Sequence, residues 1–81
     1  MDENNLIDMA NRIGDFFESM PDHEEALAGV ADHIRRFWEP RMRRMLIAAL
    51  DEGRAQDMTA FTREAVLSHR EQLMPATPAA A

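Results

Sequence analysis

The sequence predicts an all-α fold, a small bundle of three to four helices, from its composition and its apolar spacing. Met, Ala, Leu, Glu and Arg are abundant, which favours helix, whereas Val and Ile are too few for several strands. Apolar residues also recur at helical spacing in four segments, with turn signals between them. A chain of 81 residues makes one domain and buries only about 60–65% of its unfolded surface. Close helix packing or a partner is therefore expected to supply stability.

The first two predicted helices cover about residues 3–19 and 22–38. Gly14 lies beside the first apolar stripe, where it predicts the close approach of another backbone. Asp22 and Glu25 have the spacing of a capping box, so the second helix is expected to begin there. The first stripe consists of Leu6, Met9, Ile13, Phe16, Phe17 and Met20, and the second of Ala26, Leu27, Val30, Ala31, Ile34, Phe37 and Trp38.

Pro40 separates the second helix from a third, which runs to about Glu52 before a natural stop at Gly53. Because proline can also kink a helix, two separate helices and one kinked helix both remain possible. Thr59 can cap a fourth helix that ends near Leu73. The predicted organisation is thus one helical domain over residues 1–73, followed by a disordered Pro- and Ala-rich tail over 74–81. The apolar faces hold Met42, Met45, Leu46, Ala49 and Leu50 in the third helix, and Met58, Phe61, Ala65, Val66 and Leu73 in the fourth.

Composition and motifs exclude several classes of function. The absence of cysteine excludes disulfides, thiolate metal sites and a cysteine nucleophile. A net charge of −6 argues against a general nucleic-acid binder. No apolar run approaches the roughly 20 residues of a membrane span, so a cytoplasmic chain with no membrane partner is expected. Ser19 and Ser68 lack a nucleophile-elbow context, and no metal, cofactor or catalytic site is predicted in this chain. We interpret it as a non-enzyme.

The strongest local feature is the arginine-rich segment, residues 35–44, which holds five of the nine basic residues. Residues 1–25 carry eight acids against a single arginine. One interpretation is intramolecular: the acidic first helix lies against this segment, and its tryptophan is in the core. The other is a docking surface, because Trp and Arg are enriched at interface hot spots. The candidate partner-binding residues are Arg35, Arg36, Trp38, Arg41, Arg43 and Arg44.

Three kinds of partner are compatible with these residues taken alone. The segment could dock on a larger protein, which is the favoured reading. It could instead bind nucleic acid, since basic and aromatic residues together contact phosphates and stack on bases. The apolar faces could also pair in a free-standing homodimer. Leu67, which points away from the apolar arc of its helix, is interpreted first as an ordinary exposed leucine and only second as a candidate for a partner contact.

Two stretches carry a family resemblance. Residues 5–17, with Asn5-Leu6-Ile7 and Phe16-Phe17, and residues 33–43, with Phe37-Trp38-Glu39-Pro40-Arg41-Met42, resemble the delta subunit of soluble NAD-dependent formate dehydrogenases. The resemblance covers about residues 5–50, and the run 37–42 is its most specific part.

The resemblance implies an accessory, non-catalytic subunit of a cytoplasmic enzyme that oxidises formate and reduces NAD. In that family the large alpha subunit carries a molybdenum or tungsten bis-pterin guanine dinucleotide cofactor and iron–sulfur clusters. The beta and gamma subunits carry flavin and further clusters. The delta subunit is associated with assembly, cofactor maturation or stability of the complex. The expected partner is therefore the alpha subunit, with beta and gamma in the same complex.

Overall fold

The computed structural model describes residues 2–75, and over this range the chain forms helices and connecting turns with no strand. The predicted all-α class is confirmed. The tail was predicted to begin at residue 74, but Met74 and Pro75 are described and Pro75 is buried; residues 76–81 lie outside the described residues. The elements are α1 (Glu3–Glu18), α2 (His23–Phe37), α3 (Pro40–Asp51), α4 (Ala60–Ser68) and α5 (Arg70–Leu73).

The helix ends follow the capping signals of the sequence. Asp22 precedes α2, and its carboxylate accepts a hydrogen bond from the backbone N–H of Glu25 at 3.1 Å. Thr59 precedes α4, and its hydroxyl oxygen accepts from the backbone N–H of Thr62 at 3.3 Å. Gly53 follows α3 with a φ of +76°, a conformation that glycine adopts without steric cost. These three predictions are confirmed.

A sharp break separates α2 from α3. Trp38 and Glu39 both have extended backbones, with ψ of 141° and 153°, and Pro40 is the first residue of α3. A residue before proline is driven out of the α region by contact with the ring, and proline fits the first helical position because it needs no N–H there. The chain therefore has two separate helices here rather than one kinked helix.

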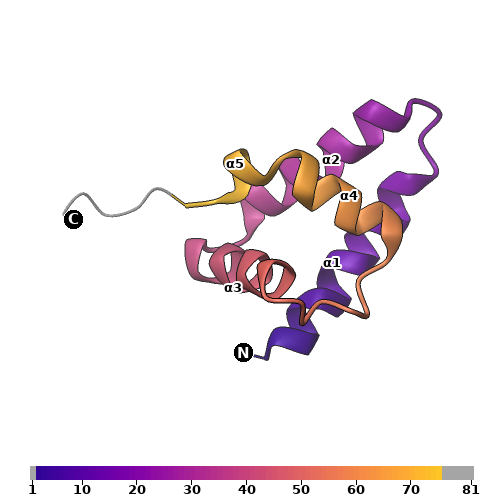
Figure 1. Cartoon of the computed structure of the whole chain (residues 1–81). Coiled ribbons are helices and arrows are strands. Elements are labelled where there is room, and N and C mark those ends of the chain that lie inside the picture. Colours follow the sequence, from indigo (N-terminus) through magenta and orange to yellow (C-terminus); the bar gives the residue numbers. More distant parts are fainter. Residues whose placement is uncertain (1, 76–81) are drawn as a thin grey trace.

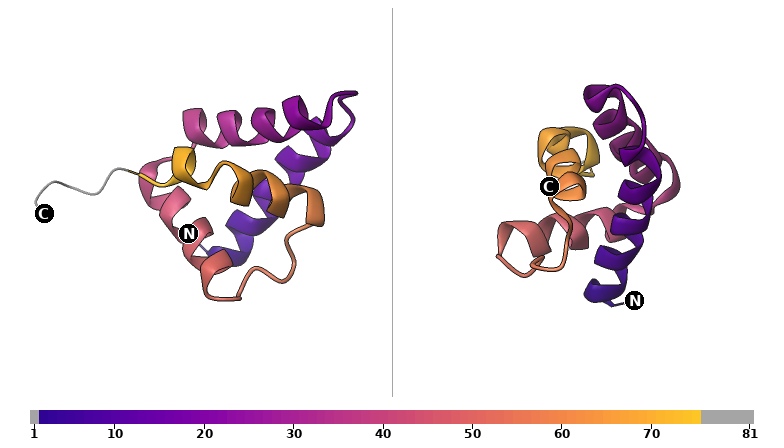
Figure 2. Two further views of the ribbon diagram at one scale, coloured as in Figure 1. Left: turned by 45° about the horizontal axis from the view of Figure 1, so that its top comes forward. Right: turned by 90° about the vertical axis from the view of Figure 1, so that its right-hand side faces the viewer.

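The helices surround one core (Figure 1). α4 runs alongside α2, and α1 crosses both, while α3 packs against α1 (Figure 2). The largest fully buried side chains come from α1 to α5 in turn, so every helix contributes to the core. They are Leu6, Leu27, Val30, Ile34, Leu46, Ile47, Thr62, Val66 and Leu73.

The fourth predicted helix is broken in two. A single helix was expected from Thr59 to about Leu73, but α4 ends at Ser68, and His69 leaves the helical region with φ −115° and ψ 28°. After the break, Leu73 is 1% exposed and packs into the core. Arg70 forms an ion pair with Asp51 at the end of α3. Burial of Leu73 against the other helices accounts for a change of direction that no proline or glycine signals in the sequence.

Two phenylalanines predicted for the core stripes lie on the surface instead. Phe16 of α1 is 74% exposed and Phe37 of α2 is 72% exposed. The predicted stripe of α1 was also displaced toward one side, because the residues it actually buries are Leu6, Ile7, Ala10 and Gly14. Periodicity places a residue on a helix face, but the neighbouring helices decide how much of that face they cover.

Candidate partner interface

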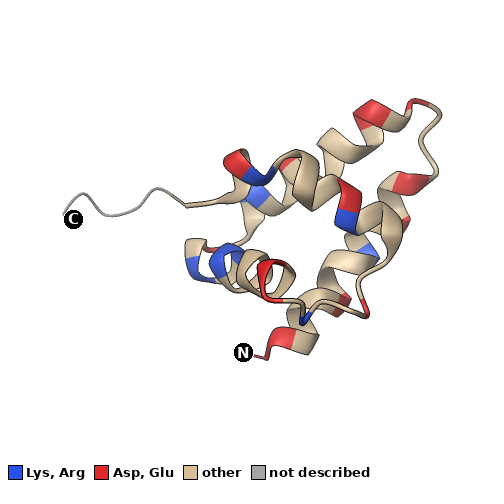
Figure 3. Ribbon diagram, in the orientation of Figure 1, with Lys and Arg blue, Asp and Glu red and all other residues tan. Residues whose placement is uncertain are grey.

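The arginine-rich segment spans the C-terminal turn of α2, the break and the first turn of α3. Basic residues gather on these turns, whereas acidic residues mark both ends of α1 and the start of α2 (Figure 3). The fold therefore keeps the charge asymmetry of the sequence as a separation in space. A basic surface on a chain of net charge −6 is suited to an acidic partner surface.

Arg35 and Arg36 share one carboxylate within their own helix. The Arg35 guanidinium donates to Asp32 at 3.0 Å, and Nε of Arg36 lies 2.9 Å from the other carboxylate oxygen. The hydrogen bond from Arg36 is the largest cause that lowers the pKa of Asp32 below its ordinary value, and Arg35 adds to it. One carboxylate thus faces two guanidinium groups, so this corner keeps a net positive charge.

Arg41 and Arg44 lie on the first turns of α3, and both are exposed. Among residues 2–75, none of the ion pairs involves either of them. Their spacing of three residues places both side chains on one side of α3. Of the arginines in the segment, these two are best placed to bind carboxylates of another chain.

Trp38 and Arg43, the other two candidates, point inward. Trp38 is 6% exposed and belongs to the hydrophobic core. Arg43 is half-buried, and its guanidinium donates to the backbone carbonyl of Leu73 at 3.4 Å. Trp38 is buried at the α2–α3 break, and Arg43 joins α3 to α5 through its hydrogen bond. Both residues therefore stabilise the backbone that carries the exposed arginines.

The intramolecular interpretation of the charges is met only in part. Trp38 is in the core, as that interpretation requires, but no ion pair among residues 2–75 joins α1 to the arginine-rich segment. Glu3 of α1 instead accepts from Arg54 in the loop after α3, at 2.9 Å. This hydrogen bond is the largest cause that raises the pKa of Arg54 further above its ordinary range. The arginine-rich segment is thus not neutralised by the acidic first helix.

Sequence reasoning missed a second surface feature, a row of aromatic rings. The aromatic row comprises Phe16, Phe17, His33 and Phe37. Its ring centroids are separated by 5.1, 6.3 and 4.8 Å in that order. With Arg12 and Ile13, three of these residues line an open hollow of about 320 Å³ between α1 and α2. The only sequence signal was the crowding of aromatic residues on two neighbouring stripes.

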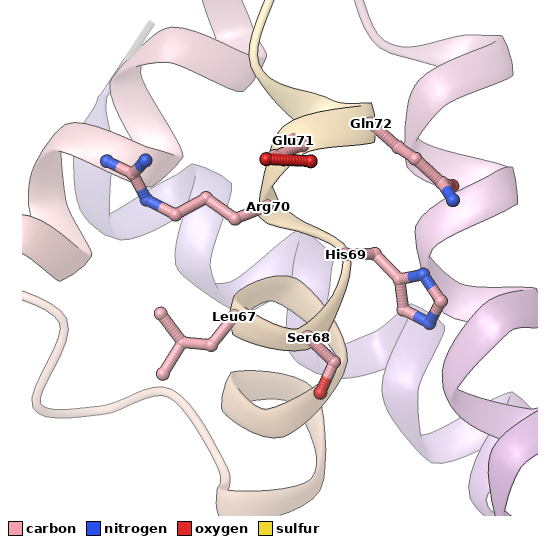
Figure 4. A pocket seen from close by; sticks show the side chains of 6 residues that line it. All are labelled: Leu67, Ser68, His69, Arg70, Glu71 and Gln72. Atoms are coloured by element: carbon pink, nitrogen blue, oxygen red, sulfur yellow. The ribbon is translucent and has the colours of Figure 1, made fainter.

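A second hollow of about 320 Å³ lies at the α4–α5 break, and its side chains do not form a binding site. In Figure 4 the side chains of Leu67 and Arg70 point to one side of the break, and those of His69 and Gln72 point to the other. Binding pockets need polar groups that converge on one volume, and these diverge. Leu67 is 49% exposed, so its predicted outward position is confirmed.

The described residues do not form a site that fits a metal or an iron–sulfur cluster. Cysteine is absent from the sequence, and residues 2–75 contain no group of three or more His, Asp or Glu side chains close enough to hold an ion. Within the same range, no helix is both long and apolar enough to cross a bilayer.

Comparison with known proteins gives a family match. The family described as NADH-dependent formate dehydrogenase delta subunit FdsD matches residues 5–66, which include all but the first two residues of α1, all of α2 and α3 and most of α4. Neither the curated proteins nor the solved structures gave a match. The matched span extends beyond residues 5–50, which carry the sequence resemblance, and it includes the arginine-rich segment and the aromatic row. The chain belongs to the delta subunit family of NADH-dependent formate dehydrogenases.

Proposed function

We propose that this chain is a non-catalytic accessory subunit that docks on the large catalytic subunit of a formate dehydrogenase. The contact would be formed by Arg41 and Arg44, with Arg35 and Arg36 across the α2–α3 break. The observation that carries the proposal is the pair of exposed arginines on α3, which have no carboxylate partner among residues 2–75, in a chain that is acidic overall. Family membership supports the enzyme named as partner.

The physical basis is recognition of carboxylates by guanidinium groups. Arginine presents a planar set of donors that can bind a carboxylate with two parallel hydrogen bonds. Trp38 and Pro40 fix the backbone from which these arginines project, so less conformational entropy is lost on binding. The molybdenum or tungsten cofactor, the iron–sulfur clusters and the flavin would belong to the alpha, beta and gamma subunits. The delta subunit would support assembly, cofactor maturation or stability of that cytoplasmic complex.

Co-purification tests the proposal. The chain is tagged and co-expressed with the alpha, beta and gamma subunits, and the retained alpha subunit is measured for the unaltered chain and for Arg41→Gln/Arg44→Gln. We expect the variant to retain several-fold less alpha subunit, because truncating one partner of a buried charge pair leaves the other without a partner. Helicity measured by circular dichroism should not change, since both side chains are exposed.

A control of matched charge separates a local contact from a general effect of acidity. Each arginine replaced by glutamine lowers the net charge by one unit, so the double variant goes from −6 to −8. The variant Gln56→Glu/Gln72→Glu reaches the same charge at exposed positions outside the arginine-rich segment. The control should retain the alpha subunit as the unaltered chain does. Equal retention by both variants would remove Arg41 and Arg44 from the interface.

Family membership gives no support to a nucleic-acid-binding regulator or to a free-standing homodimer.

A further inference from the structure

The aromatic row is distinct from the arginines of the proposed contact, although Phe37 at its end directly follows Arg36, and it is unusual for a surface of this size. Phe16 and Phe37 are the two most exposed large apolar side chains of the described residues, at 74% and 72%. Single exposed apolar residues are common, but these two end a continuous row that passes through Phe17 and His33. Contiguous apolar surface beside a hollow is a feature of interaction sites.

The hollow has walls suited to an apolar ligand surface. Ile13 and the rings of Phe16, Phe17 and His33 line it, with Arg12 at its edge. Arg12 is already paired with Asp8 at 3.0 Å, so little net charge faces the hollow from α1 at that point. Aromatic rings on rigid helices gain contact area on binding with little loss of side-chain entropy.

The charges at the two ends of the aromatic row differ in sign. Asp15 and Glu18 flank Phe16 and Phe17 along α1, and both are exposed. At the other end, Arg36 directly precedes Phe37 but is paired with Asp32, and Glu39 follows; across the break lies Arg41, which has no ion-pair partner among residues 2–75. A segment that lies along the row and continues past Phe37 therefore meets acidic residues near Phe16 and Phe17, apolar rings in the middle and the unpaired Arg41 beyond Phe37.

We propose that the aromatic row is the docking groove for an amphipathic helix of the large subunit. That helix would present aliphatic side chains to the rings and carboxylates to the end at Phe37, in the manner of helix-in-groove recognition. The inference rests on the proposed function for the identity of the partner and adds a surface to it. A second copy of this chain is the less favoured occupant, because two chains of net charge −6 repel each other.

Substitution of the row tests the groove directly. Phe16→Ser/Phe37→Ser is compared with Leu67→Ser/Met74→Ser, which removes two exposed apolar side chains elsewhere. We expect the dissociation constant for the complex to be about tenfold higher or more for the first variant. The second variant should have the dissociation constant of the unaltered chain. Circular dichroism should show folded protein in both cases. If the unaltered chain does not co-purify with the alpha subunit, the proposed function fails; if both variants bind as it does, the groove alone fails.

Photo-cross-linking identifies the occupant. A photoreactive phenylalanine analogue is placed at Phe37, and at Leu67 as a control, in the tagged chain within the complex. The expected result is a cross-link from position 37 to a segment of the alpha subunit with helical apolar periodicity and Asp or Glu at one end, with none from position 67. A cross-link to a second copy of the chain, or none from position 37 in an intact complex, would overturn the inference.

Discussion

Gly14 of α1 lies so close to Thr62 of α4 that a β-carbon at residue 14 would collide with the Thr62 hydroxyl oxygen and come within 3.3 Å of the Thr62 β-carbon. Thr62 is fully buried, and its hydroxyl oxygen is 2.8 Å from that of Thr59. The glycine therefore permits α1 and α4 to cross in close contact. The sequence predicted the close approach of another backbone at Gly14, whereas the nearest atoms are side-chain atoms of Thr62 and Phe61.

Gly14→Ala is expected to destabilise the fold by about 1–2 kcal/mol. Alanine gains about 1 kcal/mol of helix propensity, but the clash must move a buried β-branched side chain off its hydrogen bond. Thermal unfolding of the chain measures the change, at about 4–8 °C per kcal/mol for a domain of this size. In a Thr62→Ala background the same substitution should become neutral or stabilising. A Gly14→Ala chain that melts at or above the temperature of the unaltered chain would contradict the argument.

Asn11→Ala should cost about 1–2 kcal/mol, because the Asn11 amide joins α1 to the loop before α4. Its amide nitrogen donates to the carbonyl of Asp57, and its oxygen accepts from the backbone N–H of Thr59, both at 2.9 Å. Asn11→Asp keeps the acceptor but directs a charged oxygen toward the Asp57 carbonyl, so it should not restore stability. Hydrogen exchange at the Thr59 amide provides the local measurement. An unchanged exchange rate at the Thr59 amide in Asn11→Ala would mean that the Asn11 hydrogen bonds do not stabilise this loop.

Truncation of the two neighbouring aromatic residues at the end of α2 should lower the free energy of unfolding by very different amounts. Trp38→Ala removes a core side chain and is expected to cost about 3–5 kcal/mol. Phe37→Ala removes an exposed ring and should change the free energy of unfolding by less than about 0.5 kcal/mol. Urea unfolding of both variants gives the comparison. Similar losses would show that Phe37 supports the fold, which would weaken its assignment to a docking groove.

The acid response of Asp32 follows from its two arginines. Its pKa in the folded chain lies below the ordinary value of 3.8, chiefly because Arg36 donates to it. A lowered folded pKa means that this contribution to stability is present above pH 3.8 and is lost as the pH falls through the folded value. A carbon-detected NMR titration should give a pKa for Asp32 that rises on Arg36→Gln, and rises less on Arg35→Gln. No rise with Arg36→Gln would contradict the assigned cause.

The sequence by itself determined where the helices begin and end wherever local chemistry decides. Asp22 and Thr59 accept backbone hydrogen bonds from residues three positions later, Gly53 adopts a positive φ, and Pro40 excludes helix from the residue before it. Each of these effects operates within a few residues of chain, so no knowledge of the packing is needed. The identity of the family could also be inferred from residues 5–50, since it depends on the order of residues rather than on their contacts.

Only the tertiary structure decided which apolar side chains are covered. Helical periodicity assigned Phe16 and Phe37 to the core faces, but the crossing of α1 with α2 leaves both outside it. The fourth predicted helix is interrupted at His69, and the interruption accompanies the burial of Leu73 against the other helices. It also separated the arginine-rich segment into Arg41 and Arg44, which are exposed, and Arg43, which bonds to the chain itself. The burial of an apolar side chain depends on contacts between residues distant in sequence. Helical periodicity and helix propensity describe only neighbouring residues, so they do not predict those contacts.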